Sequence, residues 1–197
     1  MRLLKVYSIL TLSTLLLGTM PLGNQAAAQS QDSAPQRSAI TIRVFKSGVF
    51  SGFAHNHVVV APIAQAKVDP AALTAEIAVA VKEMKVTDPD ISEKDRAEIQ
   101  DTMLGPKVLD QEQFPEIRFR SSRIEQTSPQ HYRVAGMLEL HGVKHEVTLE
   151  VTGEPSHYHG ATRLKQSEFG IKPISMGGGS IKVKDELELE FDVYPAK

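Results

Sequence analysis

Residues 185–193 read DELELEFDV, and this segment determines the fold class that the sequence predicts. Its apolar residues occupy every second position and alternate with acidic ones: Leu187, Leu189, Phe191 and Val193. Successive side chains of a strand point to opposite faces of a sheet, so this period of two predicts a strand with one buried face and one wet face. We interpret the acidic residues as a solvated face and not as a catalytic pair.

The segment YRVAGMLELHGVKHEVTLEV repeats this alternation twice. Leu138 and Leu140 share one face before Gly142, and Val147 and Leu149 share one face after it. Two alternating segments joined by a short glycine-containing loop are typical of a β-hairpin.

Further strands are expected at shorter and less regular apolar runs: residues 40–45, 53–61, 63–68, 75–81, 117–124 and 158–164. The total is about eight or nine strands, and few intervals are long enough for crossover helices, so antiparallel pairing is expected. On the strand at 75–81, Ala78 and Ala80 lie opposite Ile77 and Val79, so one of its faces carries small side chains. Small side chains on a wall favour an interior with room in it.

The segment ISEKDRAEIQDTMLGP breaks the strand pattern. Ser92 and Asp95 form a capping box, Ile99 and Met103 share one side at helical spacing, and Gly105 marks the end. These signals predict one helix over about residues 92–104. Many antiparallel strands with one helix predict an all-β fold, a barrel or sandwich with a helical insertion that covers an opening or an edge.

The first 28 residues have the order of a secretory signal peptide. A basic start precedes an apolar run at 6–17, and small residues at 26–28 mark the expected cleavage site after Ala28. The alternative is a retained membrane anchor, but about a dozen apolar residues fall short of the roughly twenty that span a bilayer. We therefore expect an exported protein, periplasmic or secreted.

The remainder divides into a disordered polar leader at 29–38 and a single domain at 39–197. The whole chain has a formal charge of −2 and no basic stripe, which argues against a nucleic-acid partner. It has no cysteine, which excludes disulfides, thiolate metal sites and a thiol nucleophile. No segment after the signal peptide is apolar enough to span a membrane, and a homodimer is left open.

Residues 91–193 resemble the YceI-like family of exported bacterial proteins. The family's motifs occur in the right order, first around a helix end and the strand that follows, then in a hairpin, a short turn and a closing acidic strand: Asp110, Phe114, Pro115, Phe119 and Ser121; Leu138, Leu140, His141, Gly142 and Val143; Glu168, Phe169 and Gly170; Asp185 and Glu186. The resemblance implies an extended, lipocalin-like antiparallel β-barrel of about eight strands. Its apolar channel would hold a long-chain amphiphile, typically a polyisoprenoid or a similar lipid.

The inward-facing apolar residues of such a barrel are the candidate ligand-binding residues. We expect the set to be Phe53, Ile77, Val79, Ile117, Phe119, Leu138, Leu140, Val147, Leu149, Phe169, Leu187, Leu189 and Phe191, with Phe53 and Phe169 nearer a mouth. No GxSxG elbow and no GxxxxGK[ST] loop occurs, so neither an enzyme activity nor a cofactor is expected. The hypothesis is a non-catalytic carrier of a hydrophobic ligand.

The front of the chain departs from the family pattern, because typical members begin with a tryptophan-containing strand and this chain has no tryptophan. It carries His55 and His57 in GFAHNHVVV, side by side on one strand face. They are interpreted as hydrogen-bonded strand-end residues, as contacts to a ligand head group, or as part of a metal site. Two ligands do not complete a metal site, which needs three or four.

Four other histidines are candidates for completing it: His141 and His145 flank a hairpin loop, and His157 and His159 repeat the spacing of the first pair. If the three pairs met at one rim, the protein would be a periplasmic His-rich metal-binding or stress-response protein. The alternative is that the pairs sit on separate edges.

Overall fold

The computed structural model describes residues 37–48 and 55–195. The strands in these residues are β1 (Ala39–Ser47), β2 (His57–Asp69), β3 (Thr74–Ala80), β4 (Lys85–Val86), β5 (Glu116–Ser128), β6 (His131–Leu140), β7 (Val143–Glu154), β8 (His157–Lys165), β9 (Ser175–Met176) and β10 (Ile181–Val193). The helices are α1 (Glu93–Leu104) and the short 3₁₀ turns η2 (Val81–Glu83), η3 (Gln166–Phe169) and η4 (Gly177–Gly179). No helix in the described residues is long and apolar enough to cross a membrane.

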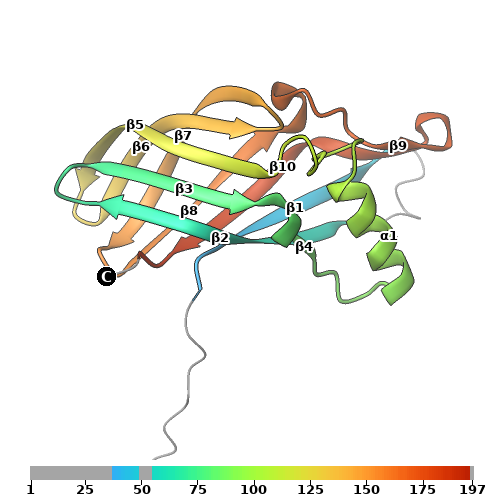
Figure 1. Cartoon of the computed structure of the whole chain (residues 1–197), viewed down its shortest axis with the longest axis horizontal. Helices are drawn as coiled ribbons and strands as arrows, with labels where there is room; N and C mark the ends of the chain where they lie inside the picture. Colours follow the sequence, from blue (N-terminus) through green and yellow to red (C-terminus); the bar gives the residue numbers. More distant parts are fainter. Residues whose placement is uncertain (1–36, 49–54, 196–197) are drawn as a thin grey trace, which may run out of the picture. The chain divides into compact units, whose positions relative to one another are not determined.

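Eight of the strands close into an antiparallel barrel in the order β1-β10-β8-β7-β6-β5-β3-β2, and β2 returns to pair with β1 (Figure 1). The two-residue strands β4 and β9 extend this sheet by pairing with β2 and β10. The predicted eight-stranded antiparallel barrel with one helix is thereby confirmed.

The closing strand β10 behaves as its alternation predicts. Leu187 and Leu189 point into the barrel. The acidic side chains between them point outward, where Glu188 pairs with Arg163 at 3.1 Å and Glu190 pairs with Arg43 at 3.1 Å. The acidic face is therefore a solvated surface that forms cross-strand ion pairs.

One prediction about strand boundaries was wrong. Residues 53–61 and 63–68 were expected to form two strands, whereas β2 runs without a break from His57 to Asp69. Residues 53 and 54 lie outside the described residues, and His55 precedes the strand, so it is not beside His57 on a strand face. Pro62, which has no N–H to donate, pairs opposite Ala39, and the register with β3 shifts between Ile63 and Gln65. The proline and the shift mark the place where β2 exchanges one set of partners for another, and not the end of a strand.

Two glycines on the inner wall allow aromatic rings to lie against the backbone of a neighbouring strand. A Cβ built on Gly136 of β6 would lie 2.5 Å from the ring of Phe119. A Cβ on Gly160 of β8 would likewise collide with the ring of Phe191. Both rings therefore lie close to the wall, because the strand beside each of them has no side chain at that position.

Helix α1 begins at the predicted N-cap, Ser92, and covers one end of the barrel beside β4 (Figure 1). The Ser92 hydroxyl oxygen accepts a hydrogen bond from the Asp95 N–H at 3.1 Å. The amide of Gln100 attaches the helix to β4: its oxygen accepts from the Val86 N–H at 2.8 Å, and its nitrogen donates to the Met84 carbonyl at 2.7 Å. One side chain thus satisfies two backbone groups that no neighbouring strand reaches.

We expect Gln100→Ala to destabilise the protein by about 2 kcal/mol, because its hydrogen bonds to the backbone of Met84 and Val86 are lost together. The free energy of unfolding is measured by denaturant titration, and the Val86 amide should exchange with deuterium faster. Asp101→Ala, at the exposed neighbouring position, is the matched control and should stay within about 0.5 kcal/mol of the wild type. Equal effects of the two variants would contradict this role of Gln100.

Candidate functional site

The interior of the barrel contains two adjoining cavities. The larger has a volume of about 460 Å³ and lies at the end covered by α1; we call it the helix-end chamber. The smaller has a volume of about 240 Å³ and reaches the turn between β2 and β3; we call it the turn-end chamber. Four residues line both: Ile40, Leu138, Leu164 and Leu189. The larger volume, and the two together, fall in the range of cavities that hold small molecules.

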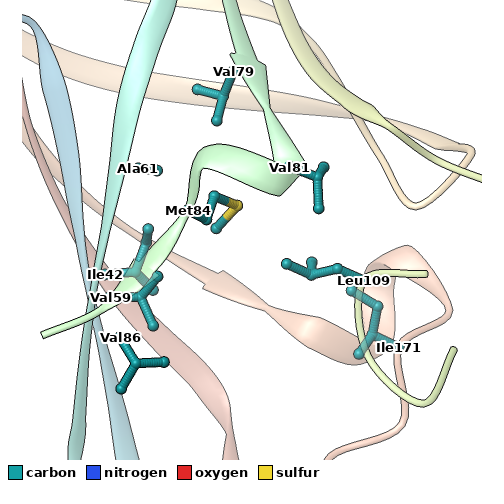
Figure 2. Packing of buried hydrophobic residues seen from close by; sticks show 9 residues of the cluster. All are labelled: Ile42, Val59, Ala61, Val79, Val81, Met84, Val86, Leu109 and Ile171. Atoms are coloured by element: carbon teal, nitrogen blue, oxygen red, sulfur yellow. The ribbon is translucent and has the colours of Figure 1, made fainter. Parts of the chain in front are cut away.

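The helix-end chamber is walled mainly by apolar side chains from several distant segments. Figure 2 shows part of this wall, with Ile42 and Val59 on neighbouring strands and Leu109 close to Ile171. Met103 of α1 closes the chamber from the helix side. The charged lining residues are three lysines and two acids: Lys46, Lys165, Lys182, Asp95 and Glu98. A guest in this chamber would therefore meet an apolar wall together with charged groups of both signs.

The turn-end chamber has a different polar lining. Its wall contains the rings of Phe119 and Phe191 and the two tyrosines Tyr132 and Tyr158, whose ring centroids lie 6.1 Å apart. The carboxylate of Asp69 lies at its edge and accepts hydrogen bonds from the Ala71 and Ala72 N–H groups of the turn. Among the residues described, its lining includes no lysine, arginine or histidine.

The structure places every described residue of the predicted ligand-binding set on the wall of a chamber. The helix-end chamber takes Val79, Ile117, Leu138, Leu140, Phe169, Leu187 and Leu189. The turn-end chamber takes Ile77, Phe119, Val147, Leu149 and Phe191, and it shares Leu138 and Leu189. Phe53 lies outside the described residues. Contact of these side chains with a ligand stays a prediction.

Two expectations about the wall need adjustment. Phe169, expected near a mouth, is fully buried in η3, with its ring centroid 5.8 Å from that of His145. On β3 the residues that line the chambers include Ile77 and Val79, whereas Ala78 lies on the opposite face. Ala78 and Ala80 line neither chamber and do not create the space inside the barrel, whereas Ala75 of the same strand lines the turn-end chamber.

Several lining residues were missed by the sequence reasoning. Met84, Val86, Leu109 and Ile171 come from the connections around α1 and η3. Those connections have no period of two, so alternation could not identify them. Tyr158 was missed for a different reason. It lies between His157 and His159, and its strand face has the glycine Gly160 as its next residue, so no run of alternating apolar side chains marks that face as inward.

His57 is held by a buried carboxylate near the start of β2. Asp88, of which 4 % is exposed, lies with Oδ2 2.6 Å from His57 Nδ1, and its Oδ1 accepts from the Val58 N–H at 2.6 Å. The Arg96 guanidinium donates to the Asp88 carbonyl at 2.7 Å, which ties α1 to the same point. His57 is thus a hydrogen-bonded strand-end residue. Since His55 and His57 also line the helix-end chamber, contact with a head group stays a prediction.

The other histidine pairs occupy different places. His141 packs on the ring of Phe114 with centroids 4.5 Å apart. His157 and His159 contact Asp192 at 2.7 Å and 3.3 Å, on strands at the end of the barrel opposite His57. The described residues include no group of three or more His, Asp or Glu side chains that could hold a metal ion.

The wall segment η3 is fixed by the first acidic residue of the DELELEFDV stretch. Asp185 accepts a hydrogen bond from the Ser167 hydroxyl at 2.6 Å and another from the Ser167 N–H at 2.8 Å. These two bonds, the hydroxyl first, lower the pKa of Asp185 below its ordinary value. Asp185 thereby holds the turn that carries Gln166 and Phe169 against the helix-end chamber.

Asp185→Asn is expected to cost about 1 kcal/mol of stability at neutral pH, a charge-assisted bond discounted for solvent exposure. Because the folded pKa is lowered, the stabilisation is complete above the ordinary pKa of 3.8 and is lost as the pH falls through the folded value. Melting temperatures of both proteins measured from neutral to acidic pH should therefore converge in acid. A difference that stays constant over this range would contradict the assignment.

Comparison with known proteins finds a matching family and a solved structure of similar fold. A family model described as a YceI-like domain matches residues 32–194. A UPF0312 protein of Pseudomonas putida (strain W619) is 31 % identical over 99 residues, which is 45 % of this chain, and the match spans about half (48 %) of that relative. The crystal structure of BcnA from Burkholderia cenocepacia superposes with a TM-score of 0.55 at 20 % identity, over 79 % of this chain and 94 % of BcnA.

The crystal structure of a Campylobacter jejuni YceI protein gives a TM-score of 0.48 at 12 % identity, over 71 % of this chain and 82 % of that one. The likeness to BcnA shows the fold alone, because its identity is low.

Proposed function

This chain belongs to the YceI-like family, and from that premise we propose that it is an exported, non-catalytic protein that binds a long-chain amphiphile in its barrel. The ligand we propose is a polyisoprenoid or an acyl lipid. The single observation that carries the proposal is the apolar helix-end chamber of about 460 Å³, which adjoins a second chamber along the barrel.

The energetics of such a site favour a long chain with little polar recognition. Each methylene transferred from water to an apolar wall contributes about 0.8 kcal/mol, so a long alkyl or prenyl tail supplies most of the affinity. Leu138 and Leu189 line both chambers, so a single chain could follow the wall from one into the other. Binding of this kind needs no catalytic group, and the sequence offers no nucleophile motif.

The test is native mass spectrometry of the protein purified from cells that export it, together with analysis of an organic-solvent extract. We expect a co-purifying apolar compound and a mature chain that begins at Gln29, which would report export as well as binding. Repeated extraction that yields no apolar compound would count against the binding function. A retained residue 1–28 segment would count against export alone.

A pair of neighbouring substitutions tests whether the chambers are the site. Leu138 lines both chambers, whereas the adjacent Met137 is 43 % exposed on the outer face. We expect the larger side chain of Leu138→Trp to occupy space where the two chambers adjoin. Binding of diphenylhexatriene, a hydrocarbon fluorophore, should weaken by about tenfold or more, the equivalent of about 1.4 kcal/mol.

Met137→Trp is the matched control and should leave the affinity unchanged. Thermal melts of both variants distinguish a blocked chamber from an unfolded barrel, since overpacking costs about 1–3 kcal/mol. Equal affinity of the two folded variants would show that the fluorophore binds elsewhere.

A further inference from the structure

Tyr158, a largely buried residue of the turn-end chamber, carries a hydroxyl that has no hydrogen-bond partner among the described residues. Tyr158 of β8 is 8 % exposed, lines this chamber and packs edge-on against Tyr132. Its hydroxyl makes no hydrogen bond within the described part of the chain. Leaving a polar group unpaired in an apolar surrounding is costly, so such a group calls for a partner from outside the protein.

The Tyr158 hydroxyl is not fully enclosed by the wall. No described side-chain nitrogen or oxygen that is fully buried lacks a hydrogen bond, so the Tyr158 oxygen must retain some access. Thr162, two residues beyond Gly160 on the same face of β8, also lines this chamber, and its hydroxyl makes no hydrogen bond within the described residues. Two hydroxyls thus stand on one inner strand face with only a glycine between them on that face.

The charge distribution of the lumen limits what the partner can be. The lysines that line the interior, Lys46, Lys165 and Lys182, all belong to the helix-end chamber. The charged residue that lines the turn-end chamber is Asp69, which would repel an anion. Burial raises the pKa of Tyr158, with a smaller contribution from Tyr132, so the phenol remains a neutral donor in the physiological range. An uncharged acceptor fits this chamber better than a carboxylate or a phosphate.

We propose that the turn-end chamber binds an uncharged oxygen acceptor of the guest, a carbonyl or an ether, through a hydrogen bond from the Tyr158 hydroxyl. The proposal rests on the proposed function, since it assumes a guest in the lumen, and it adds an orientation. The acceptor end of the molecule lies among the tight turns, and the remaining chain extends along the shared wall toward the helix-end chamber.

The test compares two probes of equal carbon number, methyl pentadecyl ketone and n-heptadecane, in competition with diphenylhexatriene. We expect Tyr158→Phe to weaken binding of the ketone about fivefold, the worth of one neutral hydrogen bond, and to leave n-heptadecane unchanged. Tyr194→Phe is the matched control: Tyr194 stacks on His157 with centroids 4.3 Å apart and lines neither chamber. It should alter neither affinity.

The infrared carbonyl band of the bound ketone gives a second readout that a packing role would not move. In the wild type the band should lie at the lower frequency of a hydrogen-bonded carbonyl, and Tyr158→Phe should shift it to the frequency of a free one. Loss of ketone and alkane affinity together, or no change in either, would overturn the proposal while leaving the binding function intact. Failure of the wild type to take up the fluorophore or either probe would overturn both.

Discussion

Backbone hydrogen bonds between β1 and β2 close the sheet, and the arrangement of the remaining strands depends on this closure. The pairing runs from Ala39 opposite Pro62 to Val44 opposite His57, while β1 pairs on its other side with β10. Without it, two long strands would expose unpaired edges. With it, alternate side chains of each strand point either into the barrel or out to solvent, because one face of the whole sheet becomes an enclosed interior.

The closed barrel contains cavities because parts of its inner wall carry no large side chain. An eight-stranded barrel has an interior that side chains can just fill, so a cavity requires wall positions with small groups or rings held aside. Gly136 and Gly160 supply such positions, and the rings of Phe119 and Phe191 lie over them. At the helix end the barrel is covered by connecting segments that include α1. This helix is attached through hydrogen bonds of Gln100 to Val86 and of Arg96 to Asp88.

The parts of the molecule that follow a period could be predicted from the sequence. The faces of β6, β7 and β10 are correct to the residue, and α1 begins at its predicted cap. The strands β4 and β9 have two residues each and are too short to show a period. The partner of His57 could not be predicted, because Asp88 lies 31 residues away and only the docking of β4 and α1 brings it close. The lack of a partner for the Tyr158 hydroxyl among the described residues could not be predicted either, because it depends on which side chains the other strands place nearby.

The acidic residues of the helix-end chamber come from a long connection, whereas its lysines belong to β1, β8 and β10. At the turn end, β2–β3, β5–β6 and β7–β8 are joined by two to four residues, which leaves little chain to bring charges over the opening. At the helix end the connection between β4 and β5 contains α1, and that between β8 and β10 contains η3 and β9. Asp95 and Glu98 reach the lumen from the first of these. The topology that closes the barrel thus gives its interior two chemically different ends, so an amphiphile inside it would have a preferred direction.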